Sequence, residues 1–185
     1  MSGPLRVEHR DGCDWVTLDR PDALNALNPD MIVALNDYFD ALRTKRNVRV
    51  VVLRGAGRAF CAGLDIKDAM TRREHKATQS SVQDSLDSQR RIADIVMKMR
   101  RCPQPIVALI NGAAAGGGFA LALAADIRIA AKGAKMNCAF IKLGLGGCDI
   151  GVSYFLPRLV GVSIASELIL TGRFIDAERA AAIGL

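Results

Sequence analysis

Apolar runs along this chain predict its strands. Residues 48–53 and 106–110 are short, strongly apolar segments, which is typical of buried strands. Residues 7–18 surround an Asp11-Gly12 turn signal and predict a pair of strands near the start. Residues 126–130 predict a further strand.

The segments between these strands have apolar residues at helical spacing. Asn28 followed by Pro29 predicts a helix start, and apolar residues then recur on one face as far as Leu42. Further helices are predicted over residues 90–99, 117–125, 153–160, 164–170 and 176–183. Because strand and helix patterns alternate, the predicted fold class is α/β.

One long segment has no convincing period. Residues 68–88 are polar, and we interpret them as a mobile loop or a frayed helix. A long irregular segment in a compact domain is often a lid. This segment is therefore the predicted lid over a ligand.

Size and charge narrow the possibilities further. A chain of 185 residues fits one domain, and with 5% aromatic residues its core must be built from Ala, Val, Ile and Leu. The net charge of +6 comes from scattered basic residues, which are either solvated helix faces or a means of attracting a polyanion such as the phosphates of coenzyme A. Net charge alone would also permit a nucleic-acid-associated domain, but no nucleic-acid-binding motif supports that, so we expect no such partner.

Cysteine and histidine usage argues against metal chemistry. Five cysteines are present without metal-ligand spacing, and neither of the two histidines lies near a second ligand type. We expect reduced thiols, no metal and a cytoplasmic location. The first residues do not resemble a signal peptide and no apolar run reaches transmembrane length, so no membrane association is expected.

Two loops that follow the apolar strands carry the candidate chemistry. Residues 58–67 and 111–119 are rich in Gly and Ala, and such small residues let a ligand approach the main chain. If each loop offers one N–H group to the same atom, the pair forms an oxyanion hole. Such a site suits a thioester carbonyl that gains negative charge during reaction.

These loops and several other segments resemble the crotonase (enoyl-CoA hydratase/isomerase) superfamily over nearly the whole chain. The matching segments are 20–27 (RPDALNAL), 59–67 (AFCAGLDIK), 105–118 (PIVALINGAAAGGG), 125–128 (ADIR), 156–161 (LPRLVG) and 170–173 (LTGR). The resemblance implies a crotonase-like (ClpP/crotonase) spiral of repeated β-β-α units, with residues 1–185 as the core domain. It implies an acyl-CoA thioester as substrate, with coenzyme A as part of that substrate and no permanently bound cofactor.

The family pattern implies roles for particular residues. The oxyanion-hole donors are the N–H groups of Leu64 and Gly117, the second at a helix start where the helix dipole favours negative charge. The residues implied for the coenzyme A pocket are Ala23, Leu24, Ala62, Asp65, Ile66 and, near the phosphates, Lys67. Asp65 fits a cap or loop hydrogen bond equally well. Cys61 is interpreted as a small buried residue, and Asp126 as an anchor of the core.

The family's usual pair of catalytic glutamates is absent. The positions that match them hold Ala120 and Phe140, neither of which can transfer a proton, so hydration is doubtful. Asp149 is the carboxylate that remains on this loop. Relatives with an aspartate here use it as a proton shuttle (dienoyl-CoA isomerases) or as a nucleophile (4-chlorobenzoyl-CoA dehalogenases), although the dehalogenase histidine would fall near Ala93. A helix N-cap is the alternative role for Asp149.

Two functions stay open at this point. One is an acyl-CoA enzyme that uses the oxyanion hole and Asp149 for double-bond migration, thioester hydrolysis or slow hydration. The other is an acyl-CoA-binding homologue with weak catalysis. Because relatives continue beyond the stretch that ends at Leu185, the resemblance also implies that the C-terminal helices that build a homotrimer or hexamer are missing.

Overall fold

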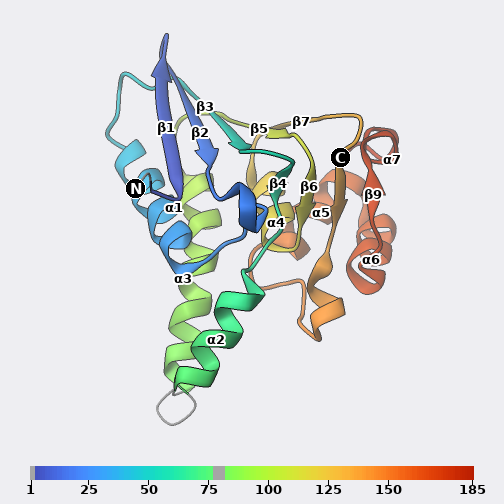
Figure 1. Cartoon of the computed structure of the whole chain (residues 1–185). Helices are drawn as coiled ribbons and strands as arrows, with labels where there is room; N and C mark the ends of the chain where they lie inside the picture. Colours follow the sequence, from blue (N-terminus) through green and yellow to red (C-terminus); the bar gives the residue numbers. More distant parts are fainter. Residues whose placement is uncertain (1–2, 77–81) are drawn as a thin grey trace.

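Strands from distant parts of the chain assemble into two sheets (Figure 1), in a computed structural model that describes residues 3–76 and 82–185. The larger sheet has the order β1-β2-β3-β5-β7, in which β1 and β2 are antiparallel and the other pairs are parallel. Its strands are β1 (Leu5–Arg10), β2 (Cys13–Leu18), β3 (Val50–Gly55), β5 (Ile106–Ile110) and β7 (Ile127–Ala130).

The smaller sheet has the order β4-β6-β8-β9, with only the last pair antiparallel. Its strands are β4 (Ala59–Cys61), β6 (Ala113–Ala115), β8 (Lys135–Asn137) and β9 (Ile175–Asp176). Three times in succession, one strand joins the larger sheet, the next joins the smaller sheet, and a helical segment follows. This arrangement confirms the predicted α/β class and the spiral of β-β-α units.

Helices surround the two sheets. They are α1 (Pro29–Leu42), α2 (Ile66–Lys76), α3 (Val82–Arg101), α4 (Gly117–Ala124), α5 (Val152–Val160), α6 (Val162–Thr171) and α7 (Ala177–Ala182), with short 3₁₀ helices η1 (Pro21–Ala23) and η2 (Ala139–Leu143). The predicted start of α1 is confirmed, because the side chain of Asn28 accepts a hydrogen bond from Met31 N at 3.0 Å. None of the helices in the described part of the chain is both long and apolar enough to span a membrane.

Of the two alternatives for residues 68–88, a mobile loop or a frayed helix, the part that the structure describes is helical, so the loop alternative is wrong there. Helix α2 extends to Lys76 and α3 begins at Val82, while residues 77–81 lie outside the described residues. Both helices project from one end of the molecule in Figure 1. The first turns of α3 are largely exposed. A helix that buries little surface needs no apolar stripe, so periodicity could not reveal it.

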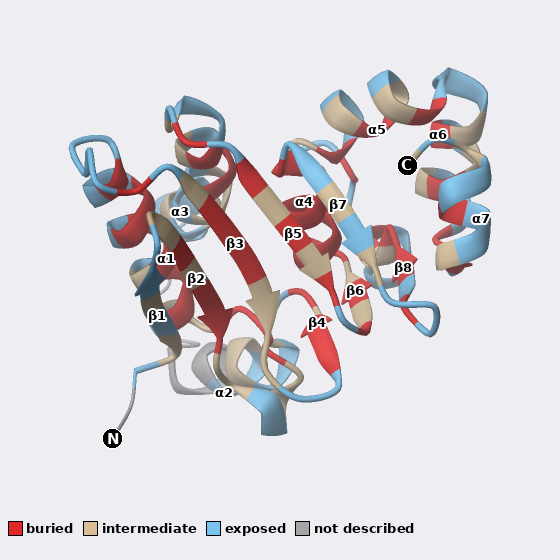
Figure 2. Ribbon diagram, turned by 90° about the horizontal axis from the view of Figure 1, so that it is seen from above, coloured by how far each residue is buried: buried red, intermediate tan, exposed pale blue. Residues whose placement is uncertain are grey.

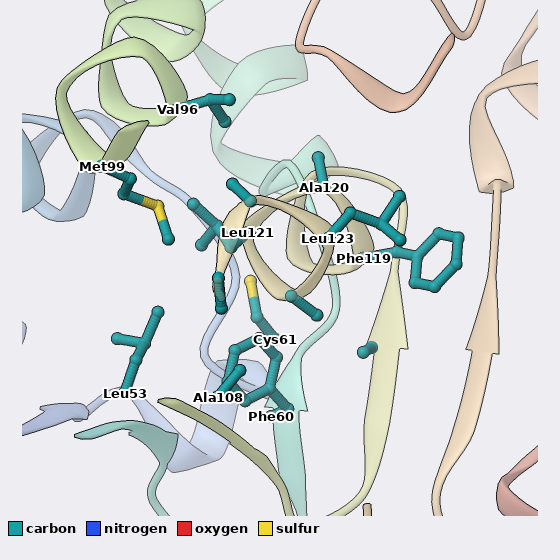
Figure 3. Packing of buried hydrophobic residues seen from close by; sticks show 14 of the residues in the cluster. Leu53, Phe60, Cys61, Val96, Met99, Ala108, Phe119, Ala120, Leu121 and Leu123 are labelled. Carbon is teal, nitrogen blue, oxygen red and sulfur yellow. The ribbon is translucent and has the colours of Figure 1, made fainter. Parts of the chain in front are cut away.

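Helix α4 lies at the centre of the core, and all of its residues are buried. Figure 3 shows its side chains between Phe60 and Cys61 of β4 on one side and Val96 and Met99 of α3 on another. Figure 2 shows that β2 and β3 of the larger sheet are largely buried, whereas the edge strand β7 is not. This packing fixes the N-terminus of α4 close to the loop that follows β4.

Candidate active site

The two small-residue loops predicted from the sequence are in direct main-chain contact. A Cβ atom on Gly63 would lie 2.7 Å from Ala115 O and 3.2 Å from Gly117 N. Gly63 also has a φ of +91°, a conformation that favours glycine. The loop after β4 can therefore approach the start of α4 this closely only because residue 63 has no side chain.

Hydrogen bonds around Leu64 determine where its N–H group points. Leu27 N donates to Gly63 O at 2.7 Å, and Asp65 N donates to Leu27 O at 3.1 Å. Leu27 and Leu64 thus form a parallel bridge. In extended chain the polar groups of successive residues alternate in direction, so the N–H of Leu64 points away from Leu27.

The N–H group of Gly117 is also available. Gly117 is the first residue of α4, where an N–H group has no acceptor within its own helix. Within residues 3–76 and 82–185, neither this group nor the N–H of Leu64 has a hydrogen-bond partner. Both residues line the same pocket.

That pocket has a volume of about 190 Å³ and is mostly apolar. The larger apolar residues that line it are Leu27, Leu64, Ile66, Ile92, Phe140, Leu143, Leu145 and Ile150. Three polar side chains also line it, namely Gln89, Lys142 and Asp149. A cavity with this balance can hold an apolar group while a few polar groups fix its orientation.

Asp149 lies in this pocket rather than at a helix cap. The N-cap residue of α5 is Gly151, in a left-handed conformation, and no side chain caps the helix there. The N-cap alternative for Asp149 is therefore wrong. Instead, one oxygen of its carboxylate accepts a hydrogen bond from the side-chain amide of Gln89 on α3. Sequence reasoning missed Gln89, because a lone glutamine on a polar helix carries no signal of its own.

The two positions that match the family's glutamates differ in their surroundings. Ala120 is fully buried within α4 and does not line the pocket, whereas Phe140 on η2 does. Neither position offers a carboxylate. Of the described residues that line the pocket, Asp149 is the only one with a carboxylate.

The segments predicted to hold coenzyme A are joined by main-chain hydrogen bonds. Ala62 N donates to Leu24 O at 3.0 Å, which places residues 23–27 beside residues 62–66. Ala62 and Ile66 line the pocket. Ala23, Leu24, Asp65 and Lys67 lie outside its lining.

Asp65 caps helix α2, and its carboxylate also pairs with a cation. One oxygen accepts a hydrogen bond from Asp68 N at 3.2 Å, and the other accepts one from the Arg20 guanidinium at 3.0 Å. Burial raises the pKa of Asp65, but the hydrogen bonds from Asp68 N and Arg20, with the charge of Arg20, outweigh it and hold the pKa below its usual value. The contact ties the start of α2 to the loop after β2.

Two further residues have structural roles, as the sequence indicated. Cys61 is fully buried, and burial raises the pKa of its thiol to about 12, although a hydrogen bond with the main chain of Gly63 acts in the opposite sense. It is therefore a buried thiol, not a reactive one. The carboxylate of Asp126 accepts hydrogen bonds from Ile106 N at 2.8 Å and from Arg100 at 2.6 Å, which anchors the start of β5.

Comparison with known proteins agrees with this fold and pocket. A family model described as "Enoyl-CoA hydratase/isomerase" matches residues 8–185. A Mycobacterium bovis protein named "Probable enoyl-CoA hydratase echA12" is 42% identical over 180 residues, covering 97% of this chain and 63% of that protein. The 1,2-epoxyphenylacetyl-CoA isomerase of Escherichia coli is 37% identical over 169 residues, covering 91% of this chain and 63% of that protein.

A solved structure is also similar to nearly the whole of this chain. The enoyl-CoA hydratase of Bacillus anthracis has a TM-score of 0.88 and 34% identity, covering 98% of this chain and 67% of that one. The chain spans less than two thirds of the length of the two curated relatives described above, 63% in each case. The match along nearly the whole of this chain establishes that it belongs to the enoyl-CoA hydratase/isomerase family.

Proposed function

We propose that this chain is the core of an acyl-CoA-processing enzyme that stabilises a thioester enolate with the N–H groups of Leu64 and Gly117. The observation that supports this most is that Leu64, Gly117 and Asp149 all line one apolar pocket. When a thioester becomes an enolate, negative charge develops on its oxygen. Fixed N–H donors and the N-terminus of α4 stabilise such charge without reorganisation.

Asp149 is the proposed acid–base group. Removing a proton next to the thioester carbonyl and returning it to another carbon requires one such group, which suits double-bond migration. Adding water needs both a base and an acid, and the side chains at Ala120 and Phe140 can be neither. Isomerisation is therefore the favoured reaction, with thioester hydrolysis as a further candidate and hydration doubtful.

Coenzyme A is the proposed carrier of the acyl group. The proposed contacts with its adenine and pantetheine come from the two hydrogen-bonded loops, through Ala23, Leu24, Ala62, Asp65 and Ile66. Lys67 is exposed beside these residues and can meet a phosphate. Because Arg20 and Asp68 N already occupy the carboxylate of Asp65, that residue contributes by holding the loop in shape.

Replacing the carboxylate tests the catalytic assignment. Asp149→Asn should lower kcat on an isomerisable enoyl-CoA by about 10²- to 10⁴-fold with little change in KM, because the amide cannot accept the proton. Turnover is followed by the ultraviolet absorbance of the conjugated thioester. Asp37→Asn, an exposed carboxylate on α1, is the control and should keep full activity. Full turnover by Asp149→Asn on every thioester that the wild type accepts would show that the assignment is wrong.

The second candidate is an acyl-CoA-binding homologue with weak catalysis. It is favoured by the replacement of both family glutamates by Ala120 and Phe140, which leaves two proton-transfer groups absent. Both candidates require the oxyanion hole, so both predict that the carbonyl stretch of a ¹³C-labelled thioester moves to lower frequency on binding. They differ in turnover across a panel of enoyl, dienoyl and aromatic thioesters, which only the enzyme would process.

A further inference from the structure

We propose that Gln89 is a positioning residue for Asp149; this inference rests on the acid–base role proposed above for that carboxylate. The side-chain Nε2 of Gln89, on α3, donates a hydrogen bond to Oδ2 of Asp149, on the loop between η2 and α5. The two residues are 60 positions apart in the chain and both line the pocket. The contact therefore joins two separate walls of the site.

The loop that carries Asp149 has little else to fix this side chain. Its sequence, residues 144–151 (GLGGCDIG), is half glycine and forms no helix or strand. Within the part of the chain that the structure describes, the Asp149 carboxylate has no salt bridge and no hydrogen bond other than the one from Gln89. Gln89 thus holds Oδ2 and leaves Oδ1 free to exchange a proton with a substrate.

The chemistry of an amide suits this role. An N–H donor favours the ionised form of a carboxylate, which is the form that a base needs. An amide does not itself take up a proton at neutral pH, so Gln89 can orient the base but cannot replace it. Held between a fixed amide and the substrate, the carboxylate is pre-organised for proton transfer.

The titratable groups that line the pocket, or that neighbour Gln89 and Asp149 in the chain, set the baseline for a pH measurement. Lys142 on η2 lines the same pocket, and its ammonium lies 5.0 Å from the centre of the Phe174 ring. The thiol of Cys148 is exposed next to Asp149 in the chain. On α3, the guanidinium of Arg90 is paired with Asp87, 3.2 Å away.

Two substitutions of Gln89 test the inference. Gln89→Leu removes the donor and should lower kcat about 10- to 100-fold, the effect of losing a hydrogen bond to a charged group, with a KM change below about threefold. Gln89→Glu places two carboxylates in contact, which disfavours two negative charges together, so the acid limb of the pH–kcat profile should move upward by about one pH unit or more. The second variant keeps the size of the side chain and remains available if the first fails to fold.

Helix α3 offers a matched control. Gln83 donates its Nε2 to Asp87 at 2.9 Å, an equivalent glutamine–aspartate contact on the same helix but outside the pocket. Gln83→Leu and Gln83→Glu should leave kcat, KM and the pH profile unchanged. A ¹³C NMR titration of the Asp149 carboxyl signal follows the same contact without turnover, and its midpoint should move upward in Gln89→Glu, where two carboxylates are in contact.

The outcomes separate this inference from the proposed function. If Asp149→Asn is inactive but both Gln89 variants keep the wild-type pH profile and NMR titration, the positioning role is wrong and the proposed function stands. If Asp149→Asn keeps full turnover, the acid–base role fails whatever the Gln89 variants do. A loss of kcat in Gln89→Leu with an upward shift in Gln89→Glu supports both.

Discussion

At the scale of single residues, the contact between Gly118 and Cys61 decides how closely α4 approaches β4. A Cβ atom on Gly118 would lie 2.0 Å from Cys61 O and 2.7 Å from Cys61 Cβ, so the two backbones would have to separate. Gly118→Ala should therefore lower the free energy of unfolding by about 1–3 kcal/mol, the usual effect of overpacking a core. Urea unfolding followed by circular dichroism measures this.

Gly133→Ala is the matched control. A Cβ atom on Gly133 would have no heavy atom within 4 Å, so this substitution should change the free energy of unfolding by less than about 0.5 kcal/mol. Equal urea midpoints for Gly118→Ala and Gly133→Ala would contradict the close contact between Gly118 and Cys61. A loss confined to Gly118→Ala would also be expected to weaken thioester binding, since α4 carries Gly117.

Sequence reasoning at this scale named residues that carry a family pattern and did not name Gln89, which carries none. Leu64, Gly117 and Asp149 were predicted as site residues, and all three line one pocket. Gln89 has no motif, because its relevance comes only from its contact with a loop 60 residues later. The N-cap alternative for Asp149 is wrong because a positive-φ glycine, Gly151, is the N-cap residue of α5 instead.

At the scale of elements, the pair of Arg20 and Asp65 links α2 to the loop after β2. Asp65 has a lowered pKa in the folded state, so its contribution to stability is present above its unfolded pKa of about 3.9 and is lost as the pH falls through the lower folded value. Asp65→Asn should cost about 1.5–3 kcal/mol near pH 7, the range for hydrogen bonds to charged groups. The stability difference between wild type and Asp65→Asn should shrink as the pH falls below about 4.

Chemical unfolding of wild type and Asp65→Asn between about pH 3 and pH 7 measures the pH dependence. Asp22→Asn, an exposed carboxylate of the same loop, should change stability by less than about 0.5 kcal/mol. A stability difference for Asp65→Asn that stays constant over the whole range would mean that the ion pair with Arg20 does not contribute.

Several of the elements that the sequence predicted correctly have a buried face. Strands β3 and β5 and helix α1 lie close to the predicted ranges, because their apolar residues face the core. Strands β4, β6 and β8 have three residues each, which is too short for a period to be read. No residue in 66–71 of α2 is buried and the first turns of α3 are largely exposed, so their pattern resembles that of a loop.

At the scale of the whole molecule, the pocket exists only in the folded chain. Its walls come from α3, η2, the start of α4, the segment around Leu64 and Ile66 after β4, and the loop that carries Asp149. These segments are brought together by the spiral, which delivers consecutive strands alternately to the two sheets. A ligand that bridges them binds the native state and not the unfolded state, and it must therefore stabilise the native state.

This coupling gives a test of where the acyl group binds. An acyl-CoA at about 100 times its dissociation constant should raise the free energy of unfolding by about 2.7 kcal/mol. At the same concentration, free coenzyme A should raise it less, because it has no acyl group to bury in the apolar pocket and no carbonyl for the N–H groups of Leu64 and Gly117. Asp149→Asn should keep the full increase, since binding the carbonyl does not require the carboxylate. Thermal unfolding with each ligand measures this, and equal shifts for acyl-CoA and coenzyme A would mean that the acyl group lies outside this pocket.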